Sequence, residues 1–153
     1  MAEHHATITW QGAATAEDFR RGKYSREHTW AFDGGVTVPA SSSPSVVPAP
    51  WSNAAHVDPE EAFVASVSSC HMLTFLYLAA KQGLVLTSYR DAAVGVMTKN
   101  AAGVPWISTI TLHPELAFAG KQPTAEELAA LHHHAHEQCF IAASIKTEVT
   151  VAT

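Results

Sequence analysis

The longest apolar stretch of the chain covers residues 62–80 and contains no formally charged side chain. The residues around it favour a helix. Asp58 suits the N-cap, Pro59 suits the first helical position, and Gly83 is a common residue just after a helix end. Glu61 follows Asp58 by three positions and completes an acidic capping box. The pattern therefore predicts one long helix between Asp58 and Gly83.

A helix that is apolar on nearly every face is either a membrane span or the centre of a globular core. Polar side chains interrupt this stretch at Ser66, Ser68, Ser69, His71 and Thr74. Such residues are unfavourable against lipid, so we expect a buried core helix.

Cys70 lies in the middle of this helix. It falls on a stripe at helical spacing that we expect to be covered: Phe63, Val67, Cys70, Thr74 and Tyr77. A buried cysteine is often a small apolar filler. Glu60, however, is a second carboxylate at the same helix end and has no part in the cap, since Glu61 has that role. A free carboxylate near a cysteine could hold an arginine beside the thiol. A reactive cysteine therefore stays open as the other interpretation.

Alternating patterns on the N-terminal side predict strands at 6–11 and 24–33, joined by a polar connection at 12–21. In the second strand Arg26 shares a face with aromatic residues, either as a stacking arginine at the strand end or as part of a site. Gly34-Gly35 predicts a hairpin turn into a strand at 36–39. A long Ser/Pro-rich loop at 40–57 follows, and such loops often border a site.

Beyond the long helix, 88–98 and 106–118 alternate and predict an antiparallel hairpin of long strands. A second helix is predicted from the N-cap Thr124, with Glu127 completing its capping box, to about Gln138. The segment 145–151 alternates again and predicts a closing strand. No repeat or boundary divides the chain, so we expect a single α+β domain over residues 1–153.

Composition limits the function. The chain has 153 residues and a net charge of −5 with histidines neutral, which argues against a nucleic-acid partner. Its first residues lack the basic and apolar regions of a secretion signal, so we expect a cytoplasmic protein with reduced thiols. Two cysteines in such a chain favour redox or catalytic chemistry over a structural disulfide. They are too few for a four-cysteine zinc site.

Four histidines gather on the second predicted helix: His132, His133, His134 and His136. His132 and His136 share a face at a spacing that metal sites use. No carboxylate motif of a metal site accompanies them, so a solvated helix face is the favoured interpretation over a metal site.

Two segments carry a resemblance to a known family. The first is Asp58-Pro59-Glu60-Glu61 leading to Cys70-His71-Met72, and the second runs from Ala135 through Cys139 to Lys146. This pair resembles the OsmC/Ohr family, the osmotically inducible and organic hydroperoxide resistance proteins. Cys70-His71-Met72 is similar to the branch in which His-Met follows the cysteine. The resemblance covers nearly the whole chain, and it implies antiparallel sheets wrapped around central helices in an intertwined homodimer.

The resemblance also implies an activity, that of a thiol-dependent peroxidase that reduces organic hydroperoxides without a cofactor. Cys70 would be the peroxidatic cysteine and Cys139 the resolving one. Glu60 and an arginine would complete the site; Arg26 is favoured over Arg21. An external dithiol, such as a lipoylated protein, would reduce the disulfide, and no nucleic acid or membrane would take part.

Two departures from the family pattern bear on the substrate and the reductant. Phe140 stands where many members have a proline after the second cysteine, and the Ser/Pro-rich loop differs from the glycine-rich loop of the Ohr branch. Two other classes stay open: a small-molecule or metal-binding module whose cysteines and histidines are ligands, and a structural dimer domain without catalysis.

Overall fold

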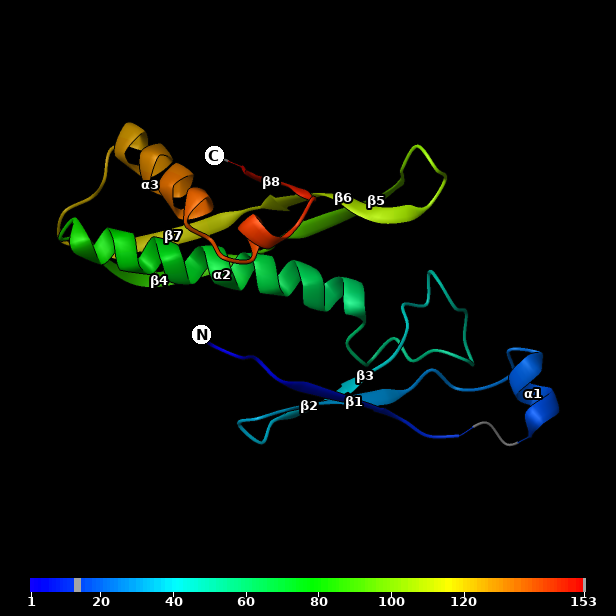
Figure 1. Cartoon of the computed structure of the whole chain (residues 1–153). Coiled ribbons are helices and arrows are strands. Elements are labelled where there is room, and N and C mark those ends of the chain that lie inside the picture. Colours follow the sequence, from blue (N-terminus) through cyan, green and yellow to red (C-terminus); the bar gives the residue numbers. More distant parts are fainter. Residues whose placement is uncertain (13–14, 153) are drawn as a thin grey trace. The chain divides into compact units, whose positions relative to one another are not determined.

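A computed structural model describes residues 1–12 and 15–152 (Figure 1). The chain separates into two compact units, Met1–Ala62 and Phe63–Thr153, called unit 1 and unit 2 below. Helices and strands mix in it, and all but one of the strand pairings are antiparallel, in agreement with the predicted α+β class.

Unit 1 is built on a three-stranded antiparallel meander of β1 (Ala6–Trp10), β2 (His28–Phe32) and β3 (Thr37–Ala40). The predicted hairpin turn between β2 and β3 is confirmed. Gly35 has φ +87°, a conformation that glycine adopts without a Cβ clash, and the Phe32 amide donates to the carbonyl of Val36.

One prediction for unit 1 is incomplete and another is wrong. The connection at 12–21 contains a short helix, α1 (Ala16–Arg20), because the Thr15 hydroxyl caps it by accepting from the amide of Asp18. The second strand starts at His28 and not at residue 24, so Arg26 precedes the sheet. The Arg26 amide donates to the carbonyl of Trp51 in the Ser/Pro-rich loop and not to a neighbouring strand.

The long helix is α2 (Pro59–Lys81), and both of its predicted ends are confirmed. Asp58 and Glu61 exchange backbone-to-carboxylate hydrogen bonds of 3.2 and 2.7 Å, which is a capping box. At the other end Gly83 has φ +72°, and the amides of Gly83 and Leu84 donate to the carbonyls of Ala80 and Ala79. These two bonds form a Schellman motif.

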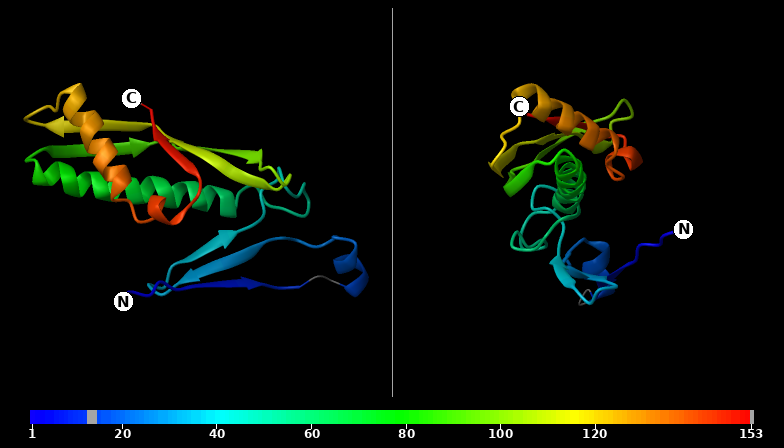
Figure 2. Two further views of the ribbon diagram at one scale, coloured as in Figure 1. Left: turned by 45° about the horizontal axis from the view of Figure 1, so that its top comes forward. Right: turned by 90° about the vertical axis from the view of Figure 1, so that its left-hand side faces the viewer.

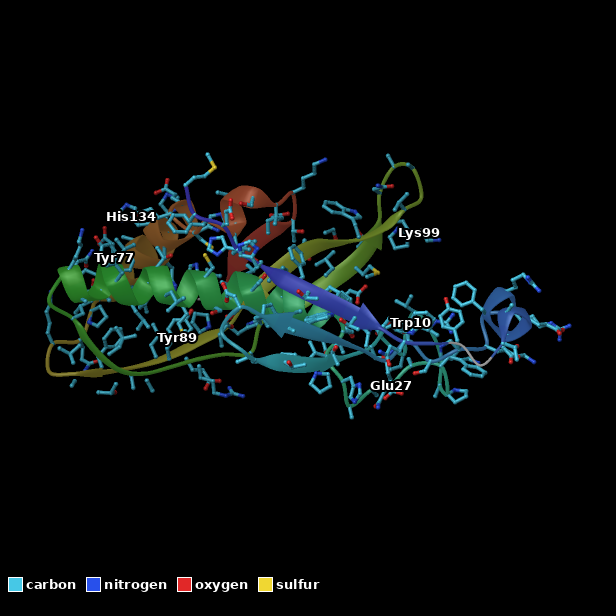
Figure 3. The ribbon with its side chains drawn as sticks, turned by 60° about the horizontal axis from the view of Figure 1, so that its bottom comes forward. Trp10, Glu27, Tyr77, Tyr89, Lys99 and His134 are labelled. Carbon is cyan, nitrogen blue, oxygen red and sulfur yellow. The ribbon has the colours of Figure 1, made fainter. Side chains whose placement is uncertain are left out.

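The covered face of α2 differs from the predicted stripe. Residues four apart are buried, namely Val67, His71, Phe75 and Ala79. Tyr77, which the stripe included and which Figure 3 labels on α2, is 55% exposed. Leu73, one turn before it, is 60% exposed. A single chain therefore covers one side of α2 and leaves an apolar side open.

Unit 2 contains the predicted hairpin in four strands: β4 (Val85–Asp91), β5 (Val94–Lys99), β6 (Pro105–Leu112) and β7 (Pro114–Ala119). The β4 strand pairs with β7 and β5 pairs with β6, both antiparallel. The long hairpin is interrupted between β4 and β5 and between β6 and β7. Asp91 stabilises this interruption, since its carboxylate accepts from the His113 amide at 2.7 Å and from the Ser68 hydroxyl on α2.

The second predicted helix is α3 (Ala125–Glu137), with the expected capping box between Thr124 and Glu127. A single 3₁₀ turn, η1 (Ala142–Ser144), follows it. The closing strand is β8 (Glu148–Val151), which pairs with β6 in parallel, so unit 2 is not wholly antiparallel.

Two apolar clusters hold unit 2 together, and α2 contributes residues to both of them. The helix runs beside the long hairpin (Figure 2). One cluster joins Phe75 of α2 with Leu131 of α3, and the other joins Val67 with Ile110 and Leu112 of β6. By length and composition α2 could cross a membrane. One stripe of α2 is buried against the hairpin and α3, as in the core helix of a globular protein.

Candidate functional site

The structure brings the two cysteines of unit 2 together, although they are distant in sequence. Cys70 lies in the middle of α2 and is half-buried, whereas Cys139 follows α3 and is 1% exposed. Both are free, and Cys70 lies close enough to Cys139 to raise the pKa of the Cys139 thiol. This proximity is what formation of an intramolecular disulfide requires.

The end of α3 places the Cys139 sulfur. The Cys139 amide closes the last turn by donating to the carbonyl of His136, and its own carbonyl accepts from the Ala143 amide. The chain then curls back, so the Ala142 amide donates to Cys139 Sγ at 3.4 Å. The short turn of η1 therefore holds the sulfur toward α2.

The surroundings of Cys139 disfavour its thiolate form. Burial raises the pKa of the Cys139 thiol, and the neighbouring Cys70 thiol raises it further, while the amides of Ala142 and Ile141 oppose the effect. A thiol with a raised pKa stays protonated at neutral pH and is a poor nucleophile. Cys139 is therefore unsuited to the first attack on a substrate.

A groove of about 500 Å³ opens beside Cys139. Residues from α2 and from the end of α3 line it: Leu73, Thr74, Tyr77, Glu137, Gln138, Cys139, Phe140 and Ala143. Phe140 is 83% exposed at its edge. The groove offers apolar walls next to Cys139, with Glu137 as its one charged residue.

Arg26 lies in unit 1, before β2. Its guanidinium stacks on the Tyr24 ring, with Cζ 3.7 Å from the ring centroid. Its Nη1 donates to the carbonyl of Gly22 at 2.7 Å and to that of Tyr24 at 2.5 Å. Among the described residues it has no carboxylate partner, so the structure does not form the expected Arg26–Glu60 pair within unit 1.

Arg26 lines a second cavity of about 470 Å³, which lies wholly in unit 1. The remaining lining is mostly apolar and aromatic: Ile8, Trp10, Phe19, Tyr24, His28, Ser41, Ser42 and Pro59. Trp10, Phe19 and Tyr24 contact one another with ring centroids 4.8 to 6.0 Å apart, and Figure 3 shows Trp10 near α1. These rings build one apolar wall of the cavity.

Glu60 and Arg21, the other residues considered for the site, differ in their partners. Glu60 is half-buried in the first turn of α2 and makes no hydrogen bond or ion pair with the residues that the structure describes. Arg21 pairs with Glu17 at 2.7 Å on an exposed surface and does not line the cavity. Arg26 is thus the one of the two arginines that faces a cavity.

A buried pair of histidines is a feature that the sequence analysis missed. His71 Nε2 lies 3.0 Å from His132 Nδ1, the two rings stack at 5.3 Å, and Phe75 stacks on His132 at 4.5 Å. The solvated-face interpretation is therefore wrong for His132, although it holds for the exposed His133 and for the exposed His134, which Figure 3 labels. His71 lies four residues before Phe75, so both fall on one face of α2, and this spacing could have indicated that His71 is buried.

The environment keeps this pair neutral. Burial and the neighbouring His132 and His136 lower the pKa of His71 to about 4, with Asp91 opposing. Burial also lowers the pKa of His132, again against Asp91. Among the described residues, no group of three or more His, Cys, Asp or Glu side chains is arranged to hold a metal ion.

Comparison with known proteins agrees with this architecture. The OsmC-like protein family model matches residues 52–153, most of the chain. The chain belongs to the OsmC-like family. An OsmC-like protein of unknown function from Vibrio cholerae O1 biovar eltor is 51% identical over 99% of both chains, with a TM-score of 0.94.

More distant solved structures share the fold. An organic hydroperoxide resistance protein OsmC from Legionella pneumophila is 14% identical, with a TM-score of 0.71 over 100% of this chain and 98% of its own. An organic hydroperoxide resistance protein from Elizabethkingia anophelis, with bound thiocyanate, is 18% identical, with a TM-score of 0.72 over 100% and 97%. A search of the curated proteins finds no match.

Proposed function

We propose that this OsmC-family protein is a thiol-dependent peroxidase that reduces organic hydroperoxides, with Cys70 as the peroxidatic and Cys139 as the resolving cysteine. The observation that carries the proposal is the pair of free thiols within reach of each other in different environments. The names of the Legionella pneumophila and Elizabethkingia anophelis proteins support the substrate class.

The chemistry follows in three balanced steps. The Cys70 thiolate attacks the distal peroxide oxygen; the O–O bond breaks, the alkoxide leaves and takes a proton, and a sulfenic acid remains. The Cys139 thiol then displaces water from the sulfenic acid, and a disulfide forms. An external dithiol reduces that disulfide by thiol exchange and becomes a disulfide itself.

Arg26 and Glu60 complete the proposed site. A guanidinium near Cys70 favours its thiolate, and it can also donate to the leaving alkoxide. Glu60 would hold the guanidinium by a bidentate pair in the assembled protein. The free state of both groups in unit 1 is compatible with this role, since neither is committed to another ion pair among the described residues.

Assembly as a homodimer is part of the proposal. Leu73 and Tyr77 leave an apolar side of α2 open, and the strands of unit 1 expose Ile8, at 59%, and Phe32, at 41%. Exposed apolar area of this kind in one chain favours burial against a second copy. We place the assembled enzyme in the cytoplasm, where thiols are kept reduced.

Single-turnover measurements on cysteine variants test the proposal. Wild-type protein with dithiothreitol should consume cumene hydroperoxide continuously. Cys70→Ser should consume none, even in the first turnover. Cys139→Ser should consume about one equivalent per chain and leave a sulfenic acid on Cys70 that dimedone traps.

Three outcomes would contradict parts of this scheme. A Cys139→Ser variant that is inactive in the first turnover, beside an active Cys70→Ser, reverses the two roles. If neither substitution matters, the cysteines are not the site of peroxide reduction. A wild-type protein that consumes no peroxide indicates an OsmC-like domain without catalysis.

A further inference from the structure

The apolar surface of α2 offers α3 more than one way to pack. Residues 62–80 of α2 carry no formally charged side chain, and the helix is apolar on nearly every face. The α3 helix is buried along one stripe, which contains Leu131, His132 and Ala135. Apolar contacts are not directional, so those of Leu131 and Ala135 alone specify the register of α3 on α2 only weakly.

A polar contact crosses this helix interface. His71 Nε2 lies 3.0 Å from His132 Nδ1, within hydrogen-bonding distance, and the two rings stack with centroids 5.3 Å apart. Burial lowers the pKa of both side chains, so both rings are neutral at pH 7 and the N–H of one donates to the unprotonated nitrogen of the other. Such a bond is directional and forms in one register of the two helices.

Packing alone does not require this histidine pair. Nδ1 of His71 is buried without a hydrogen-bond partner among the described residues, and this costs free energy that a leucine of similar size would avoid. Where helices meet along an apolar seam, a single buried polar contact can fix their register at a cost in stability. The position of His71 and His132 between two helices fits that role.

The register decides whether the two cysteines can meet. Cys70 is the neighbour of His71 in α2, and Cys139 follows His132 by seven residues, just past the end of α3. A disulfide needs Cα atoms about 4.4–6.8 Å apart, whereas one helical turn measures about 5.4 Å. A slip of α3 by one turn would therefore take Cys139 out of reach of Cys70.

We propose that the hydrogen-bonded pair of His71 and His132 sets the register of α3 on α2 and thereby positions Cys139 for the resolving step. Both histidines act through Cys139, so they are positioning residues and not catalytic ones. The inference rests on the proposed roles of Cys70 and Cys139, and it adds the interaction that holds the second cysteine beside the first.

Equilibration of the full chain with dithiothreitol measures this positioning without peroxide. The two protein thiols form a disulfide while oxidised dithiothreitol takes up their two electrons and two protons, and the equilibrium constant reports how well Cys139 is held beside Cys70. His132→Leu removes the hydrogen bond and should lower that constant about threefold to tenfold, as expected for one hydrogen bond. His132→Asn places an amide near the position of Nδ1 and should restore most of the constant.

Two further variants separate register from packing. The double variant His71→Leu/His132→Leu leaves no unpaired ring nitrogen, so it should keep its helix content by circular dichroism and still show the lowered constant. His134→Leu, the same change at an exposed position of α3, should keep the wild-type constant. A wild-type constant in the double variant would overturn the inference, because apolar packing would then set the register. An equal loss in His132→Asn or in His134→Leu would overturn it too, because the hydrogen bond would then not be the cause.

The outcome is separable from that of the peroxidase proposal. In a Cys139→Ser background, His132→Leu should leave the rate of the first peroxide turnover unchanged, since that step needs only Cys70; a slower rate would overturn the inference, because the pair would then act on Cys70 itself. A disulfide constant that depends on the pair, without peroxide consumption by the wild type, would refute only the peroxidase. Peroxide consumption with equal constants in the wild type and His132→Leu would refute only the role of the pair.

Discussion

The buried pair of His71 and His132 should make the folded state sensitive to mild acid. His71 is 1% exposed and has a pKa of about 4, against 6.5 for the free side chain. Between these two values the unfolded chain binds more protons than the folded one. The contribution of the neutral His71 to the free energy of unfolding is therefore fully present above pH 6.5 and is lost as the pH drops toward 4.

The structure also gives the size of the effect. The two pKa values differ by about 2.5 pH units, so His71 accounts for at most about 3.5 kcal/mol of unfolding free energy, at about 1.4 kcal/mol per pH unit. His132 adds to this in the same direction, because burial lowers its pKa too. For a protein with ordinary marginal stability, such a loss is large.

Urea unfolding at a fixed protein concentration, from pH 7 to pH 4, measures it. His71→Gln keeps a side-chain donor for His132 but cannot titrate, so its stability should fall less steeply with acid than that of the wild type. His133→Gln, on the exposed face of α3, should follow the wild type. Parallel curves for His71→Gln and the wild type would refute the reasoning, because the buried imidazole would then not be the proton-linked group.

Three further outcomes are expected. Gly95→Ala should cost about 1–3 kcal/mol of unfolding free energy, because its Cβ would lie 2.5 Å from an α2 side chain; Gly34→Ala, in open space, should cost far less. Arg26→Ala should slow alkylation of Cys70 by iodoacetamide at pH 6–7, by about tenfold per unit of pKa lost, and an unchanged pH profile would contradict the role of this arginine. Leu73→Lys on the open side of α2 should shift sedimentation toward a monomer that keeps its helix content; an undisturbed dimer would exclude that face from the interface.

The local signals in the sequence placed the candidate residues on their secondary-structure elements. The cysteine in the middle of a helix, the spare carboxylate at Glu60 and the second cysteine after α3 all lie where the patterns placed them. The sequence could not show that the Cys139 sulfur turns back to Cys70, because that depends on the short 3₁₀ turn after α3. Nor could it show the partners of Arg26, since two backbone carbonyls from a glycine-containing loop bind the guanidinium.

The sequence by itself determined the elements and their ends. Capping boxes at Asp58 and Thr124, the left-handed glycine at Gly83 and the alternation of the long hairpin are interactions between near neighbours, so composition at a few positions is sufficient. Tertiary structure decided which face of each element is covered. The α2 helix is apolar all round, and only the hairpin and α3 select the side that carries His71. Long-range packing therefore paired His71 of the core helix with His132, whose own sequence context suggested solvent.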